Sequence, residues 1–95
     1  MTNSLNLNGY YTISAKAVIR PERFGGLVYR YDNRRLYFLH SHELVEFVRE
    51  ALDGQQTLDA TLKQFIDAHQ LPANAREVFL KALVQLKKLE VIHEL

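Results

Sequence analysis

The chain has 95 residues, of which 47% are hydrophobic and 24% are charged, and its formal net charge is +1. These proportions indicate one soluble globular domain with a single modest core, and no hydrophobic stretch approaches the roughly 20 residues needed to cross a bilayer. Because the chain contains no cysteine, it forms no disulfide and supplies no thiolate to an iron–sulfur cluster, a zinc ion or a covalent intermediate.

Charge is distributed unevenly along the chain. Residues 1–40 hold six basic and two acidic side chains, a net charge of +4, whereas residues 41–69 hold two basic and six acidic side chains, a net charge of −4. Either these two parts attract each other within one small domain and the other charges are solvated, or the basic part presents a surface to an acidic partner.

The first residues differ in composition from the rest. Residues 1–9 are rich in Asn and Ser and are expected to form a disordered N-terminus, with a single domain over residues 10–95. These first residues have neither the basic start nor the apolar centre of a secretory signal, so we expect a cytoplasmic protein.

An extended segment is expected next. Residues 10–20 alternate as a β-strand does, and we predict that the strand ends at Pro21, because proline cannot donate to a β-ladder. The pair Gly25-Gly26 tolerates positive φ angles and is predicted to form a tight reversal of the chain.

A hairpin is predicted after this reversal. Residues 27–31 alternate and are rich in β-forming side chains, Asp32-Asn33 suits a turn, and residues 36–39 form the third strand. A sheet of three strands in so short a chain cannot easily pair both of its edges. An unpaired edge is either an aggregation hazard or a docking site for a further strand, and we expect a docking site.

Three helices are predicted in the second half. Ser41, Thr57 and Asn74 are suitable N-caps, Gly54 is expected to end the first helix, and the third helix is expected to run to about Leu89. Three strands followed by three helices predict an α+β domain.

The third helix has more apolar surface than one core face requires. At 100° per residue, one arc of the helix is predicted to face the core. It consists of Val78, Phe79, Ala82, Leu83, Leu86 and Leu89. Leu80 and Val84 fall outside this arc, beside Arg76 and Lys87. They either pack against the sheet or the C-terminal tail, or form the floor of a groove whose opposite wall is the third strand.

Patterns typical of catalysis or metal binding are missing from the sequence. Glu43, Glu46 and Glu50 follow one another along a helix face that is expected to be solvated, and His40 and His42 have no further ligand at metal-site spacing. No nucleophile elbow or phosphate-binding loop is present. We therefore expect a non-catalytic protein without a cofactor.

Two motifs carry a resemblance to a known family. The pattern R-P-E-x-F-G-x-L-x-Y spans Arg20 to Tyr29, and R-x-L-x-F-L spans Arg34 to Leu39. Together they resemble the mycofactocin-system peptide chaperone family, a PqqD-like family of RiPP recognition elements, and the resemblance covers roughly residues 11–52.

The resemblance implies a winged-helix-like domain in which three antiparallel strands pack on three helices. Members of such families bind the leader of a ribosomally made precursor peptide as a further strand, covered by the third helix. They present the peptide to a separate radical S-adenosylmethionine enzyme, which modifies it, and in the mycofactocin pathway the product is a peptide-derived redox cofactor.

The interpretation of the residues and the resemblance indicate the same surface. Candidate peptide-binding residues are Leu36, Tyr37, Phe38, Leu39 and His40 on the strand edge, Leu80, Leu83 and Val84 as apolar contacts, and Arg76 and Lys87 as partners of leader carboxylates.

Two other functions remain open. A winged-helix DNA-binding protein would use Arg30, Arg34 and Arg35 on a hairpin wing, although a net charge of only +1 argues against a nucleic-acid partner. A structural subunit would pair its open strand edge with a second copy of itself. We expect no membrane partner.

Overall fold

The computed structural model describes residues 5–95 and has a mixed α+β fold. Its elements are β1 (Tyr11–Ile13), β2 (Ala17–Glu22), β3 (Gly25–Arg30), β4 (Arg35–Leu39), α1 (His42–Glu46), the π-helix η1 (Phe47–Ala51), α2 (Leu58–Ala68), α3 (Ala75–Lys88) and β5 (Ile92–Glu94). The predicted α+β class, with a three-stranded antiparallel sheet and three helices, is confirmed.

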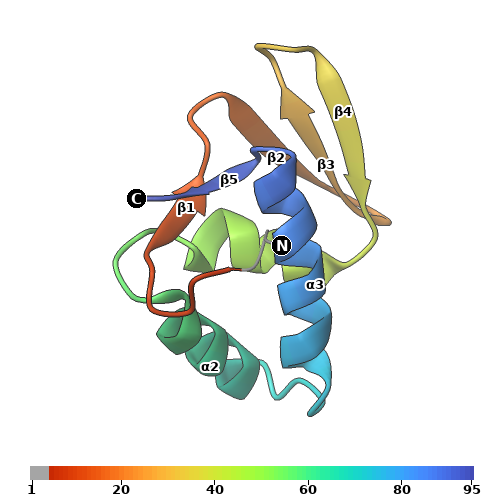
Figure 1. Cartoon of the computed structure of the whole chain (residues 1–95). Helices are drawn as coiled ribbons and strands as arrows, with labels where there is room; N and C mark the ends of the chain where they lie inside the picture. The colour runs from red at the N-terminus through yellow and green to blue at the C-terminus, as the bar shows by residue number, and fades with distance from the viewer. Residues whose placement is uncertain (1–4) are drawn as a thin grey trace.

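The three-stranded sheet has the order β2-β3-β4, with antiparallel pairing throughout. In Figure 1 it forms the upper part of the molecule, and the helices lie below it. Because side chains alternate across a sheet, the register defines two faces. Ile19, Val28 and Tyr37 form one row on the inner face, and Val18, Tyr29 and Leu36 form the neighbouring row on the outer face.

The predicted first strand is in fact two strands. β1 is not part of the three-stranded sheet and pairs with β5, a short strand near the C-terminus. The prediction that Pro21 ends the strand is wrong, because β2 continues to Glu22 and Pro21 lies opposite Gly26. Since β2 is an edge strand, a residue without an N–H group is accommodated there.

The reversal between β2 and β3 lies two positions earlier than predicted. Arg23 and Phe24 form the turn, and Gly25 already belongs to β3, opposite Glu22. Gly25 has a φ of 145°. A Cβ atom at this position would lie 2.1 Å from the carbonyl oxygen of Leu39. The glycine therefore permits the close approach of β3 to the end of β4.

Two of the three predicted helix caps are confirmed. The Ser41 hydroxyl accepts a hydrogen bond from the Leu44 amide over 3.1 Å, and the Thr57 hydroxyl accepts one from the Ala60 amide over 3.2 Å. Asn74 occupies the N-cap position of α3, but its side chain makes no capping hydrogen bond. The first helix changes to π geometry at Phe47 and ends at Ala51, before Gly54.

The core lies where the helices meet the inner face of the sheet. At its centre, Phe47 of η1 packs edge-to-face against Phe65 of α2 and Phe79 of α3, with ring centroids 5.3 Å and 5.5 Å away. Phe47 and Leu83 have no exposed surface. The prediction that Val78 faces the core is wrong, because 55% of this side chain is exposed.

Residues 1–4 lie outside the described part of the chain, so the expected disorder of the N-terminus is not tested there. Residues 5–9 are attached to the domain: the amides of Leu58 and Asp59 donate to the carbonyl oxygens of Gly9 and Leu7, over 2.9 Å and 3.0 Å. Within residues 5–95, no helix combines the length and the hydrophobicity that crossing a membrane requires.

Candidate functional site

The outer edge of β4 is open in the described part of the chain. β4 pairs with β3 on one side, and no other described strand lies along its second side. Along this edge the exposure alternates: Leu36 and Phe38 are 51% and 59% exposed, while Tyr37 and Leu39 are half-buried on the inner face. Such an edge can accept an additional strand, whose side chains would alternate between the same two faces.

Both ends of β4 are held in place. At its start, the Asn33 side chain accepts a hydrogen bond from the Arg35 amide over 2.9 Å, and Arg34 adopts a φ of 59° in the turn. At its end, Gly25 brings β3 close to Leu39, and the cap at Ser41 begins α1 directly afterwards. The position of the edge is therefore fixed before any partner arrives.

Four of the five predicted edge residues belong to β4, and the fifth, His40, follows its last residue. His40 is exposed, and its ring lies 5.6 Å from the ring of Phe24, which also contacts Phe38 at 5.8 Å. These three rings come from the β2–β3 turn and from the end of β4. They form an aromatic group at one end of the open edge.

The predicted cationic residues of α3 contact α2 and β1. Arg76 Nη2 donates a hydrogen bond to Asp59 of α2, and Lys63 Nζ lies 3.3 Å from the same carboxylate. The hydrogen bond from Arg76, with a further contribution from Lys63, holds the pKa of Asp59 below its ordinary value. Lys87 Nζ lies 6.0 Å above the ring centre of Tyr11 in β1, a cation–π distance.

These two contacts fix the orientation of α3. Leu80 and Val84 lie between Arg76 and Lys87 on the same flank of the helix, because the four positions recur every three or four residues. Figure 1 shows α2 and β1 on one side of α3 and β4 on the other. Leu80 and Val84 therefore lie on the flank of α3 whose charged neighbours contact α2 and β1.

Of the predicted apolar contacts, Leu83 is fully buried and Leu80 packs against the core. Leu83 would thus support a groove from beneath and would not touch a peptide. The opposite flank of α3 carries exposed Val78 and half-buried Ala82. Helical spacing alone gives the angles between these residues but not the direction of the sheet, so the sequence could not select this flank.

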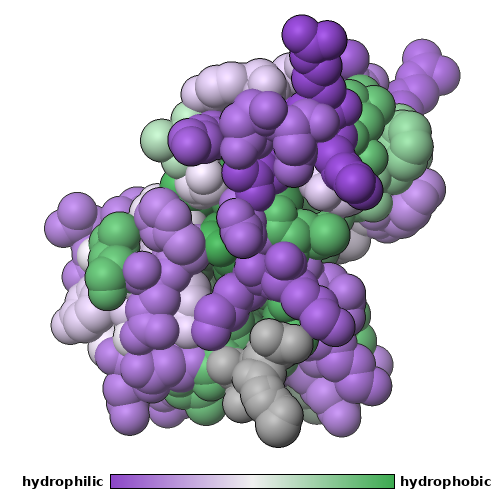
Figure 2. All heavy atoms as spheres, turned by 45° about the horizontal axis from the view of Figure 1, so that its top comes forward, coloured by the Kyte–Doolittle hydropathy of each residue, from purple (hydrophilic) through white to green (hydrophobic). Residues whose placement is uncertain are grey.

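Figure 2 shows hydrophobic side chains at the bottom of a recess between the three-stranded sheet, at the top of the view, and the rest of the molecule. On the sheet side, the inner face of β4 presents Tyr37 and Leu39, which pack partly against the core. A strand added to β4 would direct every second side chain toward this recess.

The sequence matches the peptide chaperone MftB family over residues 10–93, nearly the whole chain. The chain belongs to the peptide chaperone MftB family. No curated protein and no solved structure was found to match it. The family match extends through α2 and α3, beyond residues 11–52, which carried the resemblance in the sequence.

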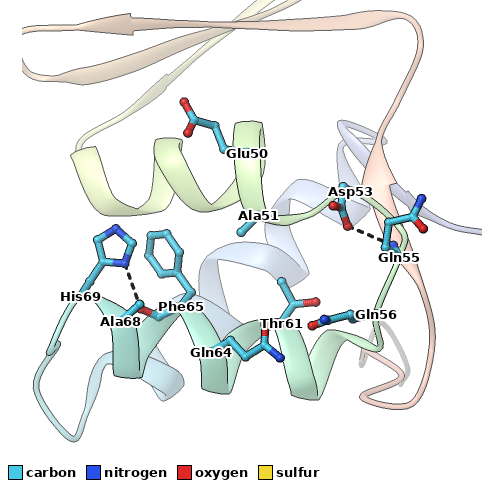
Figure 3. A pocket seen from close by; sticks show the side chains of 10 residues that line it. All are labelled: Glu50, Ala51, Asp53, Gln55, Gln56, Thr61, Gln64, Phe65, Ala68 and His69. Atoms are coloured by element: carbon cyan, nitrogen blue, oxygen red, sulfur yellow. Dashed lines mark hydrogen bonds between the residues drawn. The ribbon is translucent and has the colours of Figure 1, made fainter.

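A second hollow of this MftB-family chain lies between η1 and α2, with a volume of about 260 Å³. Figure 3 shows His69 and Phe65 at one end of it and Asp53 and Gln55 at the other. His69 stacks on Phe65, with ring centroids 4.0 Å apart. Among residues 5–95, no group of three or more His, Asp or Glu side chains could hold a metal ion.

Arg30 is buried. A winged-helix DNA-binding protein would need this side chain on the surface of its hairpin wing. The guanidinium binds Asp32 through two hydrogen bonds and donates to the carbonyl oxygens of Leu89 and Glu90. The hydrogen bond from Arg30 lowers the pKa of Asp32, so this carboxylate stays ionised. Of the three arginines proposed to contact DNA from the hairpin wing, Arg30 is therefore not accessible to it.

Proposed function

We propose that this chain binds the leader segment of a ribosomally made precursor peptide as a fourth strand on β4, in a winged-helix-like module, and presents the peptide to a separate radical S-adenosylmethionine enzyme. The observation that carries the proposal is the open edge of β4 in a member of a peptide chaperone family. The modified peptide would be the precursor of mycofactocin, as the resemblance to the mycofactocin-system chaperones implies.

The main chain of β4 supplies affinity in this proposal. The outward amide and carbonyl groups of residues 35–39 would complete a ladder with the leader, and the edge is held in place by both of its turns. Since the edge is ordered in advance, binding orders the leader alone, which lowers the entropic cost of association.

Selectivity would come from the side chains on the two faces. Leader residues directed inward would contact Tyr37 and Leu39 on β4 and the Val78 flank of α3, whereas residues directed outward would lie beside Leu36 and Phe38. Apolar side chains at every second leader position would suit both faces.

The proposed contribution to the reaction is proximity. A chaperone that holds the leader and contacts the enzyme raises the effective concentration of the peptide at the catalytic site. The cysteine-free chain would leave the cluster chemistry to its partner, and no catalytic group is required here.

Calorimetric titration with the precursor peptide, combined with amide hydrogen exchange, tests the proposal. We expect saturable binding, together with slower exchange in β4 (Arg35–Leu39) and little change in β2 (Ala17–Glu22), the opposite edge of the same sheet. Two N-methylated leaders should be compared, one methylated at odd and one at even positions. Only the leader whose methyl groups replace the amides directed at β4 should lose affinity. Binding of the precursor without slower amide exchange in β4 would contradict strand addition.

A symmetric dimer paired through β4 is the competing explanation for the open edge. Sedimentation of the chain with and without precursor distinguishes the two. A monomer that takes up one peptide supports the proposal, whereas a dimer that excludes the peptide supports a structural role.

A further inference from the structure

The outer face of the three-stranded sheet is an exposed apolar surface. Val18, Tyr29 and Leu36 lie side by side across β2, β3 and β4, and 38% to 52% of each side chain is exposed. Tyr31 and Phe38, 51% and 59% exposed, extend the same face at its two ends. A shallow hollow of about 460 Å³ lies over its centre.

No described element covers this face. The helices pack on the opposite side of the sheet, where Ile19 and Val28 are buried. A small monomeric domain rarely leaves several large apolar side chains adjacent on one surface unless that surface binds something. The site of strand addition is the edge of β4, so a bound leader would leave this face uncovered.

The charges around the face are positive. Arg20 lies on the face itself, and its side chain is 72% exposed although it contacts Glu22. Arg23 and Arg34 lie in the turns at opposite ends of the sheet, and neither forms an ion pair with a described carboxylate. Figure 2 shows strongly hydrophilic side chains beside hydrophobic ones over this upper part of the molecule.

We propose that the outer face of the β2-β3-β4 sheet, centred on Val18, Tyr29 and Leu36, docks a folded protein partner whose surface has an apolar centre surrounded by carboxylates. An apolar centre with a charged rim is the usual composition of a specific protein interface, and complementary charge accelerates and orients docking. A second copy of the chain fits less well, because two such faces would place their arginines against each other.

The partner is identified with the modifying enzyme only if the proposed function holds. A leader strand on β4 would continue the rows of the sheet, so its outward side chains would lie next to Leu36 and Phe38. An enzyme docked on the outer face would then lie immediately beside the peptide. Docking to the free chain does not require the peptide, however, so the two proposals can be tested separately.

The experiment measures two affinities for each variant, using the precursor peptide and the radical S-adenosylmethionine enzyme of the mycofactocin pathway from the same genome. Tyr29→Glu places a negative charge at the centre of the face, and Tyr10→Glu is the matched control, since Tyr10 is 45% exposed outside this sheet. We expect Tyr29→Glu to weaken enzyme binding at least about tenfold. Leader affinity should change less than about twofold, and the control should change neither value.

Arg20→Ala keeps the test decisive if Tyr29→Glu does not fold. Removing this exposed cation should weaken enzyme binding several-fold and reduce its dependence on salt. Unchanged enzyme affinity in the folded variants overturns the docking proposal, as does a native chain that does not bind the enzyme. Dissociation of a dimer of the chain by Tyr29→Glu would overturn it as well, because the face would then bind a second copy. If the native chain binds the enzyme but does not bind the leader, the proposed function is overturned and this inference is supported.

Discussion

The buried guanidinium of Arg30 in β3 donates a hydrogen bond over 3.1 Å to the main-chain carbonyl of Leu89, at the C-terminal end of α3. Asp32 binds the same guanidinium from the turn that leads to β4. A cation at this end of a helix also interacts favourably with the helix dipole. One side chain thus fixes α3 relative to the hairpin that carries the open edge.

Replacing Arg30 should therefore destabilise the whole domain. Arg30→Met removes every one of these hydrogen bonds and leaves the carbonyl groups of Leu89 and Glu90 without this donor, so Tm should fall by several degrees. Arg30→Lys retains the charge but not the paired N–H donors of a guanidinium, so its Tm should lie between those of the native chain and Arg30→Met. Thermal unfolding followed by circular dichroism measures this, and a Met variant as stable as the native chain would contradict the assigned role.

Much of the fold could be predicted because the signals are local. Ser41 and Thr57 cap helices through their own hydroxyl groups, within three residues of their partners. Pro21 and Gly25 were misplaced because tertiary context decides their roles: an edge strand accommodates the proline, and the approach of Leu39 requires the glycine. The residues next to Pro21 and Gly25 in the sequence indicate neither the edge position of β2 nor the approach of Leu39.

The candidate site divides in the same way. The open edge of β4 follows from the small number of strands, which the sequence shows. The α3 contacts depend on which flank of the helix meets the sheet, and Arg76 and Lys87 reveal that direction only through Asp59 and Tyr11. A helical projection has no external reference, so it could not tell whether Leu80 and Val84 face β4 or the opposite side.

Two valines on opposite flanks of α3 test which side covers the leader. Val78→Glu places a charge on the flank opposite Arg76 and Lys87, where we propose that the leader binds, and we expect leader affinity to fall about tenfold because an apolar contact becomes a buried charge. Val84→Glu is the matched control and should leave leader affinity within about twofold. Both affinities are measured by calorimetry on variants with native circular dichroism. The opposite ranking would restore Leu80 and Val84 as the peptide contacts.

Stability should depend on pH through His69. Its Nε2 lies 3.0 Å from a Glu46 carboxylate oxygen and its Nδ1 3.0 Å from the Phe65 carbonyl oxygen, and both partners are acceptors. A neutral ring could donate to only one of them. The hydrogen bond to Glu46, followed by that to Phe65, raises the pKa of His69 above its ordinary value of 6.5.

Because the folded-state pKa is the higher one, protonated His69 contributes its full stabilisation below about pH 6.5, and the contribution is lost as pH rises through the folded-state pKa. Glu46→Gln should therefore lower the free energy of unfolding more at about pH 6 than at about pH 8.5. Urea denaturation at the two pH values measures the difference. Glu77→Gln, at an exposed position of α3, is the control and should show the same small effect at both. An effect of Glu46→Gln that grows with pH would contradict the assignment.

Gly25 should control the geometry of the open edge. Alanine there would be forced into a φ of 145° and would place its Cβ atom against the Leu39 carbonyl, so we expect a loss of stability of about 1–3 kcal/mol from the backbone strain alone. Gly26→Ala is the neighbouring comparison: its Cβ atom would lie 2.7 Å from a side-chain methyl group of buried Val45, but its φ is not positive, so it lacks the backbone strain. Denaturant unfolding gives the stabilities, and leader titration of the folded fraction shows whether the edge has shifted. If Gly25→Ala is as stable as Gly26→Ala and binds the leader normally, the close approach of β3 at this glycine does not fix the end of β4.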